Sequence, residues 1–207
     1  MSTSPTIHHH KGDLPDGLSL GPSIAVDTET MGLNPVRDSL CVVQLSAGDG
    51  EVHVVQLDRS SYAAPNLVAL MGDQSVLKIF HYARFDIAFM KKYLSVDTQP
   101  VYCTKIASKL VRTYTDKHGL KDLCRELISV DMSKQQQSSD WGAETLSDAQ
   151  LHYAASDVLY LHQLKDQLDQ MLSREGRAHL AQRSFDFLPV RAELDLGGWS
   201  EMDIFSH

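Results

Sequence analysis

The sequence predicts an α/β fold in which helices flank a mixed five-stranded sheet. Apolar runs of strand length come first along the chain, runs of strand and helix length then alternate, and the last third repeats apolar residues at helical spacing. The chain has 207 residues, 43% of them apolar, which suffices for one well-packed core. We therefore expect a single domain over residues 1–207, with a short C-terminal tail from about residue 185.

The first three strands are expected to form an antiparallel meander. A turn-forming Gly-Asp-Gly stretch joins the second strand to the third, and a short segment joins the first two, which favours antiparallel pairing. The runs rich in β-branched and other apolar residues are Ile24–Thr28, Leu40–Ala47 and Val52–Leu57.

Two further strands are expected to add in parallel. Short strands predicted at Leu77–Phe80 and Val101–Cys103 alternate with helices predicted at Asn66–Met71 and Arg84–Leu94. Connections that contain a helix are typical of parallel pairing. The predicted sheet is therefore mixed, with three strands in a meander and two added in parallel.

The rest of the chain is predicted to be mainly helical. Thr104–Arg112 and Leu120–Ile128 carry apolar residues three and four positions apart, and a polar loop then leads to Trp141. A long helix is expected to begin after the cap residue Ser147 and to end near Gly176. The tail is too apolar to stay in solvent, so we expect it to pack on its own domain or on a neighbouring subunit.

The charge of the chain limits the ways in which it could bind nucleic acid. The formal charge of −8 argues against general electrostatic binding of a long nucleic acid, which uses a basic surface. Residues 105–125 are an exception, because they hold six basic residues and two acidic ones. This segment is interpreted either as a solvated helix face or as a rim that attracts phosphate.

Three further features bear on location and on metal binding. No stretch reaches the roughly 18 consecutive apolar residues of a membrane span, and the N-terminus lacks the apolar core of a signal peptide, so we expect a cytoplasmic protein without membrane contact. Cys41, Cys103 and Cys124 are widely spaced among apolar neighbours and are expected to be packed thiols. The histidines at positions 8–10 are expected in a flexible terminus, and we assign them no role.

Four acidic residues in three segments form the candidate site. Asp27 and Glu29 end the first strand, where alternation of side chains points both to the same face. Asp86 lies in an otherwise apolar helix, and Asp157 shares a helix face with Tyr153. Each feature alone has an ordinary structural explanation, but together they predict a site for two hard divalent cations, Mg²⁺ or Mn²⁺, which would support hydrolysis of a phosphodiester.

These motifs resemble those of the DEDDy 3′–5′ exonucleases, which have the ribonuclease H-like fold found in ribonuclease D and proofreading exonucleases. The matching stretches are "VDTETMGL", "HYARFD" and "YAASD", and "HGLKDLC" also looks like ribonuclease D. The resemblance implies that Asp27 bridges two metal ions and that Glu29 and Asp157 complete the first ion site. It also implies that Asp86 holds the second ion and that Tyr153 orients the attacking water.

The short length and the stretches "TKIASKL", "SKQQQSSDW" and "LPVRAELDL" look like the nanoRNase C group of this family. Resemblance to that group implies a ring-shaped homo-octamer that degrades very short RNAs, above all 5′-phosphorylated dinucleotides such as pGpG, to nucleoside 5′-monophosphates. Two other functions stay open: the same chemistry on tRNA 3′ ends or single-stranded DNA, and a catalytically silent module that binds nucleic acid. The complete set of five motif residues argues against the silent module.

Candidate substrate-binding residues surround the acids. Leu33 follows the first motif closely and is interpreted either as an apolar wedge between two bases or as a turn residue that packs inward. The polar loop before Trp141 offers a cation, amides and hydroxyls that could hold a terminal 5′-phosphate. The full set of candidates is Thr28, Met31, Leu33, His81, Arg84, Lys134, Gln135, Ser138 and Ser139.

Overall fold

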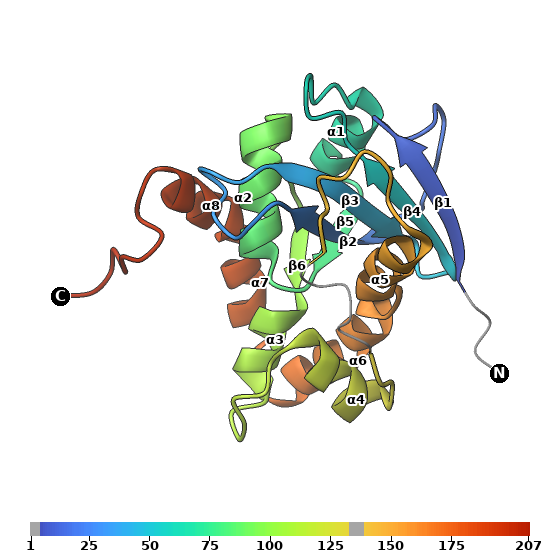
Figure 1. Ribbon diagram of the computed structural model, residues 1–207. Helices are drawn as coiled ribbons and strands as arrows, with labels where there is room; N and C mark the ends of the chain where they lie inside the picture. The colour runs from blue at the N-terminus through green and yellow to red at the C-terminus, as the bar shows by residue number, and fades with distance from the viewer. Residues whose placement is uncertain (1–4, 133–138) are drawn as a thin grey trace.

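The computed structural model describes residues 5–132 and 139–207 (Figure 1). Its strands are β1 (Thr6–Lys11), β2 (Ser23–Thr30), β3 (Leu40–Ser46), β4 (Glu51–Gln56), β5 (Leu77–Phe80) and β6 (Val101–Cys103). The helices in the first part of the chain are α1 (Pro65–Gly72), α2 (Ala83–Leu94), α3 (Thr104–Val111) and α4 (Leu120–Ile128). Those in the last part are α5 (Asp148–Leu159), α6 (Leu161–Arg174), α7 (Ala178–Asp186) and α8 (Leu188–Leu196).

One mixed sheet forms the centre of the fold, with the strand order β1-β4-β3-β2-β5-β6. Strands β2, β3 and β4 form the predicted antiparallel meander, and β5 and β6 add to it in parallel through helix-containing connections. Every residue of β3 is buried, because the sheet carries helices on both sides (Figure 1). The α/β prediction is therefore confirmed.

The predicted number of five strands is wrong, because the described part of the chain forms a sheet of six. The additional strand, β1, contains the histidines at positions 8–10, which were expected in a flexible terminus. This strand pairs with β4 in parallel along its whole length, so its backbone groups that face β4 have partners, and Ile7 packs against the core. A run of histidines has no strong strand propensity, and the available edge of β4 was not visible in the sequence.

The long helix predicted from Ser147 to about Gly176 is two helices. Ser147 does cap α5, through a capping box with Gln150. Helix α5 then ends at Leu159, and α6 begins at Leu161 after the cap residue Tyr160, whose backbone angles (φ −107°, ψ −2°) depart from ideal helical values. Buried residues continue across this break at intervals of three, from Val158 to Leu161, so the apolar period did not reveal it.

The C-terminal segment packs on its own domain as far as α8. Helix α8 lies along α2, where Asp195 accepts hydrogen bonds of 2.5 and 2.7 Å from Arg84. The residues after α8 extend away from the body of the molecule (Figure 1). Several of their large apolar side chains are exposed, including Met202, Ile204 and Phe205.

The remaining expectations about the chain concern membranes and cysteines. Within residues 5–132 and 139–207, no helix combines the length and the apolar character needed to cross a membrane. All three cysteines are buried and unpaired, as expected for packed thiols.

Candidate active site

The carboxylates of Asp27, Glu29 and Asp157 converge near the C-terminal end of β2. One oxygen from each lies within 4.8 Å of the corresponding oxygens of the other two. Asp157 belongs to α5, which packs across β2, β3 and β4. The completely buried Ala154 and Ala155 leave room for this close approach of helix and sheet. The structure therefore brings two of the three predicted motifs into one cluster.

Asp86 reaches the same region from α2. It is only 2% exposed, and its Oδ1 accepts a 2.7 Å hydrogen bond from the Thr28 hydroxyl. Because Thr28 alternates with Asp27 and Glu29 along β2, the helices α2 and α5 approach this strand from opposite faces. The negative charge of Asp86 still raises the pKa of Asp27, so all four acids share one electrostatic environment.

Burial is the main cause of the raised pKa values of these acids. The pKa of Glu29 rises to about 9, and those of Asp86 and Asp157 rise to about 7. The pKa of Asp27 also lies well above its ordinary value, and the neighbouring carboxylates add to the effect of burial there. A cation placed among these groups would favour their charged forms. An oxygen-only donor set fits a hard ion such as Mg²⁺ or Mn²⁺.

Gln44 is a site residue that the sequence analysis missed. It pairs with Asp27 across β2 and β3, and its Nε2 donates a 2.7 Å hydrogen bond to Oδ2 of Asp27. The side chain is completely buried, and its Oε1 has no hydrogen-bond partner among the described residues. A signal was present, because Gln44 is the one amide in the apolar stretch "CVVQLS" and a buried amide requires partners.

Tyr153 lies one turn before Asp157 on α5 and forms a hydrogen bond with it. Burial and the negative charge of Asp157 raise the pKa of Tyr153 above its ordinary value. The phenol therefore stays protonated at neutral pH and remains a hydrogen-bond donor. Trp141 is 3% exposed and packs against Tyr153, with the two ring centroids 6.0 Å apart. This packing restricts the orientation of the phenol.

The acids open into a cavity of about 720 Å³. That volume lies within the range of roughly 300–1,000 Å³ typical of small-ligand sites. Five of the predicted substrate-binding residues line the cavity, namely Thr28, Met31, Leu33, His81 and Ser139. Arg84 is not one of the described residues that line the cavity. Its guanidinium is hydrogen-bonded to Asp195 of α8 instead. Three further candidates, Lys134, Gln135 and Ser138, lie outside the described residues.

Leu33 projects from the loop between β2 and β3 with 84% of its surface exposed. The alternative interpretation, that it packs inward, is therefore wrong. Asp38 braces this loop by accepting hydrogen bonds from the Asn34 amide (2.9 Å) and from the Arg37 side chain. The loop thus presents an apolar side chain at the cavity in a restrained position.

His81 contributes a neutral imidazole to the cavity wall. Burial, and to a lesser extent the charge of Lys105, lower the pKa of His81 to about 3. Its Nδ1 lies 2.9 Å from the Thr104 hydroxyl, which fixes the ring. An uncharged imidazole suits hydrogen bonding to a sugar hydroxyl better than charge pairing with phosphate.

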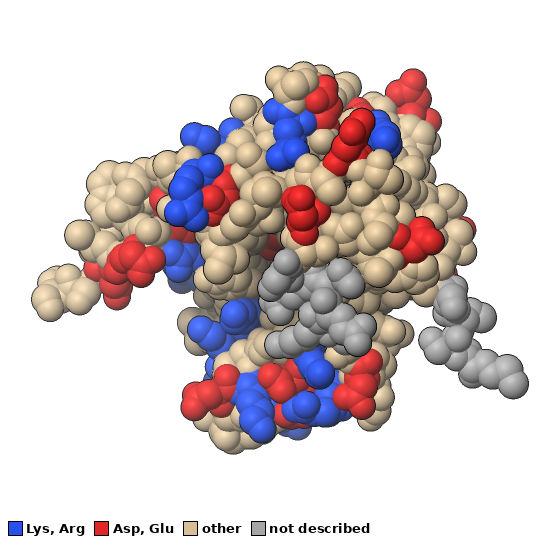
Figure 2. Space-filling view, viewed as in Figure 1, with Lys and Arg blue, Asp and Glu red and all other residues tan. Residues whose placement is uncertain are grey.

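The basic segment 105–125 divides into residues that line the cavity and residues that do not. Lys105 and Lys121 line it, and Nζ of Lys105 lies 4.2 Å from the ring centroid of Tyr82. Arg112 is completely buried, so it belongs neither to a solvated face nor to a rim. Around α3 and α4, Lys and Arg side chains alternate with acidic ones on the surface (Figure 2).

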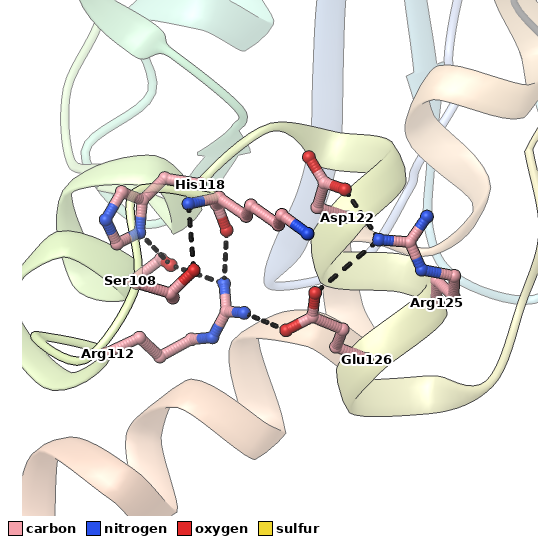
Figure 3. Close-up of polar contacts among 8 residues, drawn as sticks. Ser108, Arg112, His118, Asp122, Arg125 and Glu126 are labelled. Atoms are coloured by element: carbon pink, nitrogen blue, oxygen red, sulfur yellow. Dashed lines mark hydrogen bonds and ion pairs between the residues drawn. The ribbon is translucent and has the colours of Figure 1, made fainter.

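Arg112 holds together the cavity wall formed by α3 and α4 (Figure 3). Its guanidinium donates hydrogen bonds to the Ser108 hydroxyl (3.2 Å), to the Lys117 carbonyl (2.7 Å) and to the Glu126 carboxylate. These contacts join α3, the segment that follows it and α4. The cap residue Gly119 and the first three residues of α4 line the cavity.

The chain is similar to proteins of known function over most of its length. A family model described as a 3′–5′ exonuclease matches residues 13–173. Ribonuclease D from Acidiphilium cryptum is 36% identical over 163 residues, which cover 78% of this chain and 41% of that protein. DNA polymerase I from Aquifex aeolicus is 33% identical over 180 residues, which cover 84% of this chain and 29% of that protein. This chain therefore spans less than half the length of these relatives.

Solved structures extend the similarity to nearly the whole chain. Brucella melitensis NrnC bound to pGG is 57% identical, with a TM-score of 0.95, over 99% of this chain and 100% of that one. The same protein with bound Mg²⁺ is 57% identical, with a TM-score of 0.94, over 98% of this chain and 99% of that one. Escherichia coli RNase D, at 24% identity and a TM-score of 0.72 over 83% of this chain and 45% of that one, shares the fold.

Proposed function

This chain belongs to the ribonuclease D-like 3′–5′ exonuclease family, in the group that contains NrnC, and we propose that it hydrolyses short RNAs from their 3′ ends with two divalent cations. The preferred substrates are 5′-phosphorylated dinucleotides such as pGpG, and the products are nucleoside 5′-monophosphates. The cytoplasm is the proposed location.

The observation that carries this proposal is the meeting of four acids at the end of β2, one of them buried and three partly buried, beside a cavity of small-ligand size. Asp27, Glu29 and Asp157 would hold one cation, and Asp27 and Asp86 would hold the other. When bound, such cations lower the pKa of the attacking water and neutralise the charge that develops on the leaving oxygen.

The side chains of this site orient the reacting groups. Gln44 holds one oxygen of Asp27 through its amide, which leaves the other oxygen available as a ligand. Tyr153 keeps its proton and hydrogen-bonds the attacking water, so it positions that water without acting as a base. His81 binds the substrate sugar as a neutral group.

Substrate length is proposed to depend on the two ends of the cavity. Leu33 separates the bases next to the scissile phosphate, since it is apolar, exposed and held by a braced loop. Lys105 and Lys121 attract the 5′-phosphate from the α3–α4 wall. The predicted phosphate contacts of Lys134, Gln135, Ser138 and Ser139 remain part of this proposal. The similarity to NrnC bound to pGG supports a short substrate.

A comparison of RNA lengths tests the proposal. The chain is incubated with Mg²⁺ or Mn²⁺ and with 5′-phosphorylated RNAs of two, three and seven nucleotides, and with matched DNA and tRNA. We expect the dinucleotide to be hydrolysed fastest and a chelator to stop every reaction. Comparable rates at all lengths would reject the dinucleotide preference and leave exonuclease activity standing. If no substrate were hydrolysed with either ion, the proposal that this chain is an exonuclease would be rejected.

A further inference from the structure

A second group of metal-ligating side chains lies at the edge of the sheet, on β1 and β4. These strands pair in parallel with His8 opposite His53. Because side chains alternate along a strand, His8, His10, Glu51 and His53 project from one face, whereas the neighbouring His9 projects from the other. Of the described residues that line the cavity, none belongs to this group. The cluster is therefore separate from the acids at the end of β2.

Three members of this cluster have the spacing of metal ligands. Nε2 of His8 lies 3.2 Å from Oε2 of Glu51, and one ligand atom from each of His8, Glu51 and His53 lies within 4.8 Å of the other two. Ligand atoms bound at 2.0–2.1 Å to a tetrahedral Zn²⁺ are about 3.3–3.4 Å apart. The three groups are therefore close enough for side-chain rotation to bring them to ligand spacing.

The fourth member, His10, orients one of these ligands. Nε2 of His10 lies 3.0 Å from Nδ1 of His53, whose ring is buried with 6% exposure. A hydrogen bond to the second nitrogen is the usual way in which a protein fixes the orientation of a metal-binding imidazole. His53 therefore presents its ring in a restrained position.

His8 and Glu51 are the more exposed part of the cluster. The His8 ring stacks on His53, with centroids 4.8 Å apart and an interplanar angle of 17°. A metal ion lies in the plane of each imidazole that binds it, so His8 must rotate out of this stack. Its side chain is 39% exposed and that of Glu51 is 55% exposed, which permits the rotation and lets an ion enter from solvent.

We propose that His8, Glu51 and His53 form a binding site for a divalent transition-metal ion such as Zn²⁺, with water completing the coordination. Two imidazoles and one carboxylate are a ligand set that zinc accepts. Imidazole ligands disfavour Mg²⁺, which takes oxygen, so this site and the acidic cluster select different ions. Because its ligands come from two strands, the bound ion fastens the edge strand β1 to β4.

Zinc titration of matched histidine variants tests this site. Zn²⁺ affinity is measured by competition with a chromophoric chelator, in excess Mg²⁺ to occupy the acidic cluster. His8→Ala should weaken Zn²⁺ binding by at least about tenfold, since loss of even an indirect partner of a metal ligand has that effect. His9→Ala removes an adjacent histidine that faces Gln56 on the other side of the strand, and it should leave the affinity unchanged.

Further measurements separate this site from the acidic cluster. In wild type, Zn²⁺ should raise the thermal midpoint in excess Mg²⁺, and both His8→Ala and Glu51→Gln should reduce that increase. His8→Ala should keep its Mg²⁺-dependent hydrolysis, and an Asp27→Ala chain should keep its Zn²⁺ binding. Equal losses of Zn²⁺ affinity in His8→Ala and His9→Ala would overturn the proposal. It would also be overturned if wild type did not bind Zn²⁺, or if Asp27→Ala lost its Zn²⁺ binding.

Discussion

The carboxylates around β2 combine partial burial with mutual repulsion, which a metal ion would relieve. At the scale of single residues we therefore expect Asp157→Asn to have opposite effects on activity and on stability. Loss of a metal ligand should lower the rate of hydrolysis by at least about a hundredfold and remove the thermal stabilisation by Mg²⁺. Without metal, the variant should be the more stable form, because one partly buried charge is gone.

Thermal unfolding with Mg²⁺ and with a chelator measures both effects. Asp166→Asn on α6 is the matched control, because this acid is exposed and lies outside the cluster. A variant of Asp157 that retained full Mg²⁺ stabilisation would contradict its assignment as a ligand.

The raised pKa values also predict how stability depends on pH. The ordinary values are 3.8 for Asp and 4.5 for Glu, whereas in the folded chain Asp86 and Asp157 titrate at about 7 and Glu29 at about 9. At pH values between the ordinary and the raised pKa values, the folded chain holds protons that the unfolded chain has released. The stability of the metal-free protein therefore falls as pH rises through this range. Below the ordinary values this contribution is fully retained.

Melting curves in a chelator, from about pH 5 to about pH 9, test the direction of this dependence. Because a cation binds the charged carboxylates, the increase in melting temperature caused by Mg²⁺ should grow over the same range. An Mg²⁺ effect that did not change with pH would mean that these acids are already ionised without metal.

At the scale of structural elements, the loop between β2 and β3 is predicted to determine how tightly the substrate binds. Leu33→Ala removes the exposed side chain that would lie between two bases, and KM for the dinucleotide should rise about tenfold with little change in kcat. Val36→Ala is the matched control, since Val36 is 54% exposed in the same loop and is not one of the described residues that line the cavity. Equal kinetics for the two variants would contradict the wedge.

The α3–α4 wall offers a second prediction at this scale. Arg112→Met removes a fully buried cation that joins three segments, so it should lower the free energy of unfolding by at least about 2 kcal/mol. Arg125→Ala should cost less than about 1 kcal/mol, because Arg125 is exposed and its ion pairs with Asp122 and Glu126 lie at the surface. Urea denaturation measures the free energy of unfolding of both variants. Equal decreases in this free energy would contradict the structural role of Arg112.

At the scale of the whole molecule, the resemblance predicts an assembly of eight chains. Helix α8 is tied to α2 through Arg84 and Asp195, so the segment after it leaves the body from a fixed point. Exposed apolar side chains of the kind found there, such as Trp199, Ile204 and Phe205, commonly mark protein interfaces. Light scattering should give the mass of an octamer, and the mass of a single chain would contradict the prediction.

The sequence by itself determined the meander, the parallel additions and the order of the acidic motifs. These follow from local patterns: alternation places Asp27 and Glu29 on one face of a strand, and a spacing of four places Tyr153 and Asp157 on one face of a helix. Such patterns depend only on neighbours along the chain, and a short stretch of residues therefore suffices to read them.

Only the tertiary structure decided which distant segment covers each side chain. It brought the N-terminal histidines beside β4, turned Arg84 toward α8 and buried Arg112, and it placed Gln44 against Asp27. Each outcome depends on contacts between residues far apart in the sequence. A polar residue has the same local pattern whether its partner is water, a substrate or another part of the chain, so these roles required the folded molecule.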